Sequence, residues 1–213
     1  MEKSFFILML STVSVAFFHA LAPDHWMPFA VIGRAQKWSN LKLLFITFIS
    51  GIGHVGISVI FSVIGIALGF TLDKLHKFEG GRGSIALWLL IGFGIAYMLW
   101  GIKQAHSHKH DDIEAEKLKK QTISVWIMFA VVILGPCEPL IPLAFLGYNF
   151  GWLGIISVSI IFSVVTLIMM LVQSFLALKG IQLIKYDIAE RYAHAFAGLV
   201  IALTGVLVMV LGI

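Results

Sequence analysis

Leu21-Ala-Pro-Asp-His-Trp-Met-Pro-Phe-Ala-Val-Ile-Gly33 begins at the end of the first apolar run of the chain, and Leu134-Gly-Pro-Cys-Glu-Pro-Leu-Ile-Pro-Leu-Ala-Phe-Leu-Gly147 lies at the end of the fourth. When one extra residue is allowed in the second stretch, Pro23 aligns with Pro136, Pro28 with Pro142 and Gly33 with Gly147. Proline inside a helix removes a backbone donor and clashes with the preceding turn. Both stretches are therefore expected to bend or break the helices that contain them.

The composition indicates a membrane protein. Of the 213 residues, 60% are hydrophobic and 12% are charged, whereas about 25% of residues are charged in a soluble domain. Six apolar runs approach the roughly 20 residues that an α-helix needs to cross a bilayer: 4–22, 43–70, 84–102, 123–146, 152–178 and 192–213. Because backbone groups in lipid must be hydrogen-bonded within their own segment, these runs are predicted to be lipid-contacting helices.

The two related stretches divide the chain into halves. Residues 1–102 and 122–213 each contain three runs, and 103–121 connects them. Successive spans alternate in direction, so two units of three spans lie in opposite orientations. The predicted fold is an all-α membrane protein of six transmembrane helices, built as two inverted three-helix repeats with a proline-broken first helix in each. Such breaks at matching positions are typical of transporters with a binding site near the middle of the membrane.

Lysine and arginine are distributed unevenly between the two sides of this topology. One side has Lys3, Lys74, Lys77 and Arg82, and the other has the remaining eleven. Cytoplasmic loops carry an excess of positive charge, so both termini are predicted to lie outside and residues 103–121 inside. The membrane is expected to be the plasma membrane of a prokaryote. The first 20 residues also have the composition of a signal peptide. We interpret them as an uncleaved helix, because cleavage there would remove His19.

Ionisable groups within a membrane are costly and are candidate functional residues. His19, Asp24 and His25 lie on either side of Pro23. On an unbroken helix they would point to three different faces, because successive residues turn by about 100°. A break at Pro23 would allow Asp24 and His25 to turn back toward His19 and form a candidate metal site. The alternative is a helix cap at the membrane surface, with Asp24 stabilising the following segment.

Three more residues are candidate metal ligands. His54 lies near the middle of the second run beside Gly51 and Gly53, and small residues let another helix approach closely; the alternative is a simple interhelical hydrogen bond. Glu138, between two prolines, is a candidate ligand or proton carrier. Cys137 is a candidate ligand or merely a small buried hydrophobic residue.

The connection 103–121 contains a tract of alternating histidines followed by acids. Such a composition is typical of a solvated metal-collecting loop, although a plain polar linker is the alternative. The candidate residues of this loop are His106, His108, His110, Asp111 and Asp112.

These motifs resemble the nickel/cobalt transporter superfamily. Four residues separate His19 from the Asp24-His25 pair, and a glycine precedes His54 in the second run. The similarity is greatest to the short branch, which includes nickel–cobalt efflux proteins and urease-accessory UreH-like membrane proteins. The efflux members carry a histidine-rich loop between their third and fourth helices. The resemblance implies that His19, Asp24, His25 and His54 take part in nickel or cobalt selection.

Two positions depart from that family pattern. Glu138 follows Cys137 where the short branch has small or serine residues, and Val55 follows His54 where the family has a serine. The identity of the metal therefore does not follow from the resemblance alone.

The sequence thus predicts a secondary transporter of divalent transition-metal ions, nickel or cobalt, with export favoured over import. We expect no enzymatic activity, no resident cofactor and no nucleic-acid partner. One alternative is an accessory membrane protein that binds metal without transporting it. Another is a thiol–disulfide electron carrier similar to the cytochrome c biogenesis membrane domains, but such proteins need paired cysteines and this chain has only Cys137.

Overall fold

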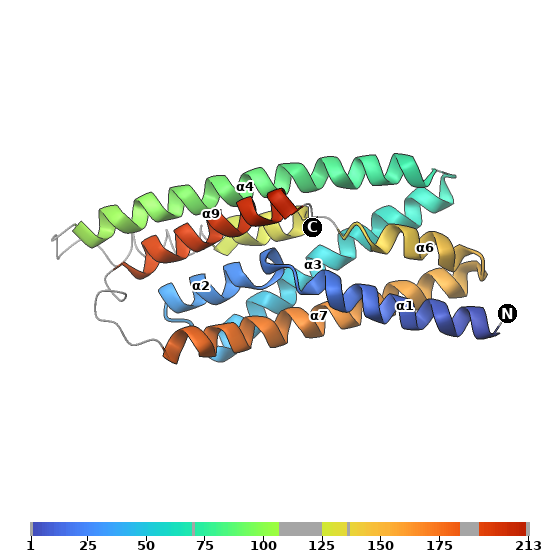
Figure 1. The fold of residues 1–213 in the computed structure, drawn as a ribbon, viewed down its shortest axis with the longest axis horizontal. Helices are drawn as coiled ribbons and strands as arrows, with labels where there is room; N and C mark the ends of the chain where they lie inside the picture. The colour runs from blue at the N-terminus through green and yellow to red at the C-terminus, as the bar shows by residue number, and fades with distance from the viewer. Residues whose placement is uncertain (1, 70, 107–124, 136, 184–191, 212–213) are drawn as a thin grey trace.

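The computed structural model describes residues 2–69, 71–106, 125–135, 137–183 and 192–211. Within these residues every regular element is a helix (Figure 1). Five of the helices are long and apolar enough to cross a membrane, and the protein is therefore an integral membrane protein. They are α1 (Glu2–Ala20), α3 (Asn40–Ala67), α4 (Leu72–His106), α7 (Gly151–Leu183) and α9 (Ala193–Leu211).

Large apolar side chains cover the outer surface of the helix bundle. Phe6, Phe18, Trp88 and Leu153 are all exposed. On a soluble protein such an extensive apolar surface would mark an aggregation or interaction site. Here it is the surface expected to contact lipid.

The first and fourth predicted spans are each broken into two pieces. The single-turn helix η1 (Pro23–His25) separates α1 from α2 (Met27–Ala35), and the helix Val125–Leu134 ends before α6 (Leu140–Tyr148) begins. Figure 1 shows α1 and α2 following one another along the long axis of the molecule, while the second pair runs in the opposite direction. Both predicted sites therefore separate two helices. The described residues contain five helices long enough to cross a membrane, so six spans in an inverted repeat remain a prediction.

Two long helix pairs complete the bundle: α3 packs against α7, and α4 runs beside α9. The α4–α9 contact is close because it is lined by small residues. A Cβ atom added at Gly94 would meet the backbone of Ala202, and one at Gly198 would meet the backbone of Met98. Small residues at such contacts let the helix backbones approach and pack tightly in the membrane.

The predicted connection between the second and third runs is wrong for most of its length. Helix α4 begins at Leu72, so Lys74, Lys77 and Arg82 lie on a helix and not in a loop. The hydropathy pattern misses these first turns because they carry most of the charges of this region, although charged residues do not stop an α-helix from forming.

Candidate metal centre

The first helix break brings together two histidines that an unbroken helix would separate. α1 ends at Ala20, Ala22 is extended with φ −56° and ψ 131°, and Pro23 starts the single turn that contains His25. His19, in the last turn of α1, then faces His25, with 3.2 Å between the two Nε2 atoms. The break has the effect expected from Pro23, because it turns His25 back toward His19.

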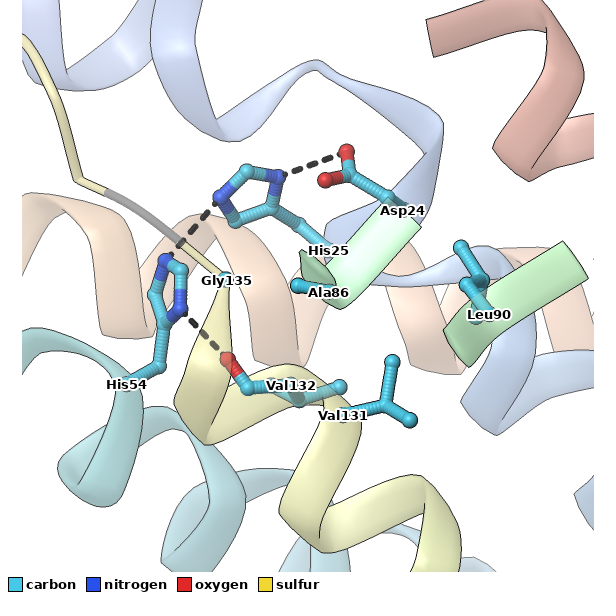
Figure 2. Close-up of a pocket in the computed structure, with 8 residues that line it drawn as sticks. All are labelled: Asp24, His25, His54, Ala86, Leu90, Val131, Val132 and Gly135. Carbon is cyan, nitrogen blue, oxygen red and sulfur yellow. Dashed lines mark hydrogen bonds and ion pairs between the residues drawn. The ribbon is translucent and has the colours of Figure 1, made fainter. Parts of the chain in front are cut away.

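His54 joins this pair from the middle of α3. Its Nε2 atom lies 3.2 Å from Nε2 of His25, and the side chain is only 3% exposed. Its other ring nitrogen, Nδ1, lies 2.8 Å from the carbonyl oxygen of Val132, on the helix Val125–Leu134. His54 thus connects the first helix break to the fourth span (Figure 2).

The second helix break contributes a sulfur atom. Cys137 is fully buried, and its Sγ lies 3.0 Å from Nε2 of His54. The ligand atoms of His19, His54 and Cys137 all lie within 4.8 Å of one another. Three imidazoles and one thiol therefore converge where the two broken spans meet.

The hydrogen bonds of two imidazoles fix which nitrogen faces the centre of the cluster. The carbonyl of Val132 can only accept, so Nδ1 of His54 donates to it. Asp24 Oδ1 lies 3.0 Å from Nδ1 of His25, which donates to the carboxylate in the same way. In a neutral imidazole whose Nδ1 carries the hydrogen, Nε2 carries the lone pair. The inward Nε2 atoms of His25 and His54 thus both present lone pairs, which a cation between them can bind.

Two nitrogen–nitrogen distances in the cluster fit a small cation. Metal–nitrogen bonds of about 2.0–2.1 Å in tetrahedral geometry place neighbouring nitrogen ligands roughly 3.3 Å apart, close to the 3.2 Å that separates the Nε2 atom of His25 from those of His19 and His54. A carboxylate or carbonyl on the outer nitrogen of a ligating histidine is also the usual arrangement at metal sites, because it fixes the ring orientation. Asp24 and Val132 occupy these outer positions.

A cavity of about 30 Å³ adjoins the cluster (Figure 2). Asp24, His25 and His54 form its polar wall. The remaining wall is apolar or backbone, formed by Ala86, Leu90, Val131, Val132 and Gly135. The volume is sufficient for one or two water molecules, so an ion at the cluster could keep part of its hydration shell.

The structure does not bring every predicted residue to this cluster. Asp24 contacts His25 and acts on the cluster through it, while Glu138 is exposed on the turn after Cys137. His106 is exposed in the last turn of α4, where its Nδ1 donates to the carbonyl of Ile102. The other loop candidates, His108, His110, Asp111 and Asp112, lie outside the described residues.

Two polar residues beside the cluster escaped prediction. Ser58 lies one turn after His54, and its hydroxyl accepts the backbone N–H of Cys137 at 3.3 Å. Arg82 donates to the same hydroxyl at 2.8 Å. The spacing of four residues between His54 and Ser58 was a usable signal for Ser58, since both lie on one helix face. Arg82 has no comparable signal, because the hydropathy pattern predicts a loop at its position.

Comparisons with protein-family models, curated proteins and solved structures give no match to this chain. The function is therefore inferred from the geometry of the site and from the sequence motifs.

Proposed function

We propose that this protein transports divalent transition-metal ions across the membrane through a site formed by His19, His25, His54 and Cys137. The observation that carries the proposal is the convergence of three imidazole nitrogens and one sulfur at the meeting point of two broken spans. Ionisable and metal-ligating groups inside a membrane mark ion pathways more often than structural contacts.

The helix breaks support transport in preference to a purely structural metal site. Broken spans at corresponding positions of two inverted halves are the usual framework of secondary transporters, whose halves rock about a central site. α2 and α6 each have nine residues and each follows a proline-containing break. In an inverted repeat α3 would correspond to α7, and α4 to α9, and these are the helices that pack against each other.

Nickel and cobalt are the proposed cargo, in line with the resemblance to the nickel/cobalt transporter superfamily. Imidazole and thiolate ligands suit cobalt, nickel, zinc and copper better than magnesium, calcium or manganese. We propose export as the direction, because the histidine and acid tract in residues 106–112 would collect metal on the predicted cytoplasmic side. An ion gradient would supply the energy, since the sequence contains no phosphate-binding motif.

Metal flux into proteoliposomes tests this proposal. Vesicles with the wild-type chain should accumulate Co²⁺ or Ni²⁺ and exclude Mg²⁺, and His54→Ala should abolish the flux because His54 contacts both helix breaks. His194→Ala is the matched control, since this histidine bonds to Tyr97 Oη at 2.8 Å, away from the cluster. Metal binding without flux in the wild-type protein would contradict transport, and equal flux in wild type and His54→Ala would contradict the site.

A further inference from the structure

Arg82 is a buried cation on the same face of α4 as the cavity wall. It precedes Ala86 by one turn and Leu90 by two, and both of these residues line the cavity beside the cluster. Its side chain is only 9% exposed. A buried charge in a membrane-spanning helix is costly and usually has a specific role. The contacts of Arg82 indicate what this role is.

Two hydrogen bonds of Arg82 lead to the second helix break. Nη2 of Arg82 donates to Ser58 Oγ at 2.8 Å and to the carbonyl of Gly135 at 3.2 Å. The Ser58 hydroxyl also accepts the N–H of Cys137. Gly135 follows the last residue of the helix Val125–Leu134, where carbonyls lack intrahelical partners and the helix dipole favours a cation. Arg82 thus ties the backbone on both sides of residue 136 to α3.

The guanidinium is itself fixed in place. Its carbon lies 5.3 Å from the centre of the Phe61 ring, at a distance where a cation is attracted to the ring face. Lys77, one turn and one residue earlier on α4, is exposed and pairs with Asp73. The two cations of one helix therefore have different surroundings, and Lys77 offers a control for Arg82.

We propose that Arg82 is a positioning residue that holds the sulfur of Cys137 against His54 by anchoring the second helix break to α3. The three histidines come from α1, the first break and α3, so none of them lies on the segment that this anchor holds. Release of the anchor would then remove the sulfur ligand alone and leave an imidazole site. The proposal rests on the metal site of the proposed function, but the position of Cys137 can be measured without metal.

The test compares Arg82→Gln and Arg82→Lys with Lys77→Gln in the purified full chain. Absorption spectra with Co²⁺ report the ligands, since a thiolate bound to Co²⁺ gives a charge-transfer band that imidazoles do not give. Alkylation by N-ethylmaleimide reports access to Cys137, the sole cysteine of the chain. Arg82→Gln should lose the thiolate band, weaken Co²⁺ binding by about 10–100-fold as outer-shell substitutions do, and speed alkylation by roughly tenfold or more as Cys137 becomes accessible.

Arg82→Lys should restore part of the band, because one ammonium can donate to both oxygens, and Lys77→Gln should match the wild type. If Arg82→Gln does not fold, Ser58→Ala serves as the second variant, because it removes the hydroxyl that accepts from both Arg82 and Cys137. An unchanged band and unchanged alkylation in Arg82→Gln would overturn the role of Arg82. A wild-type chain that binds no Co²⁺ would instead overturn the proposed function. Even then, slow alkylation of Cys137 in the wild type and faster alkylation in Arg82→Gln would support the anchor.

Discussion

The two helix breaks are alike in construction and different in chemistry. Each follows a proline in a membrane-spanning segment and precedes a nine-residue helix. The first directs His25 inward, two residues after Pro23, whereas the second directs Cys137 inward, one residue after Pro136. The acids differ as well, since Asp24 bonds to His25 and Glu138 is exposed. The inward side chain thus lies two residues after the proline in one break and one residue after it in the other, and this difference decides which side chain reaches the centre.

The breaks also differ in what holds them. In the first, Gln173 and Ser174 of α7 donate to the carbonyls of Ala20 and Trp26, at 3.1 Å and 3.4 Å. The second is held by Ser58 of α3 and Arg82 of α4. Each break is thus bonded to helices of the other half of the chain. A movement of one half against the other would therefore strain both breaks together, as the proposed transport requires.

The largest effect is expected from the imidazole of the first break. His25→Ala removes the ring whose Nε2 contacts both His19 and His54. Co²⁺ binding should weaken by at least about 100-fold, more than outer-shell substitutions cost, as measured by titration of the purified protein. His194→Ala controls for the loss of a histidine elsewhere. Equal affinities in the two variants would remove His25 from the site.

The sulfur of the second break should affect metal preference more than overall binding. Cys137→Ser replaces a soft thiolate with a hard hydroxyl, and soft ligands favour zinc and cobalt over manganese. The affinity for Zn²⁺ and Co²⁺ should fall by about tenfold while that for Mn²⁺ changes little, as measured by competition titration. An equal loss for all three ions would indicate that the substitution disturbs the fold and not the ligand set. Full flux of Co²⁺ in this variant would also eliminate the thiol–disulfide alternative.

The smallest effects separate the carboxylates of the two breaks. Asp24→Asn keeps an oxygen that can accept from Nδ1 of His25 but loses the charge, so Co²⁺ affinity should fall by about tenfold. Glu138→Gln is the matched change in the second break, and its exposed side chain should leave the affinity within about twofold of the wild type. Isothermal titration of both variants measures the difference. A larger loss in Glu138→Gln than in Asp24→Asn would reverse the assignment of the two acids.

The sequence was sufficient to predict the elements that depend on composition and on proline. The apolar runs predicted membrane helices, and Pro23 and Pro136 predicted two breaks, because these signals are local. His19, His25 and His54 could be named in advance, since an imidazole has few reasons to lie within a membrane.

The remaining features depend on three-dimensional packing. Whether Asp24 faces the cluster directly or through His25 depends on the backbone angles after Pro23, as does the outward direction of Glu138. Arg82 could not be predicted as a residue near the site, because its charge and those of its neighbours lower the hydropathy of the first turns of α4. Its partners, Ser58 and Gly135, come close only when the second break packs against α3.

X-ray absorption spectroscopy of the Co²⁺-loaded full chain tests the central claim most directly, because it counts the ligands of a bound ion. If both breaks and α3 supply the site, the first shell contains three nitrogen atoms at about 2.0–2.1 Å and one sulfur at about 2.3 Å. Cys137→Ser should lose only the sulfur. A first shell of oxygen atoms alone, or one without sulfur in the wild-type protein, would contradict a metal centre assembled from the two helix breaks.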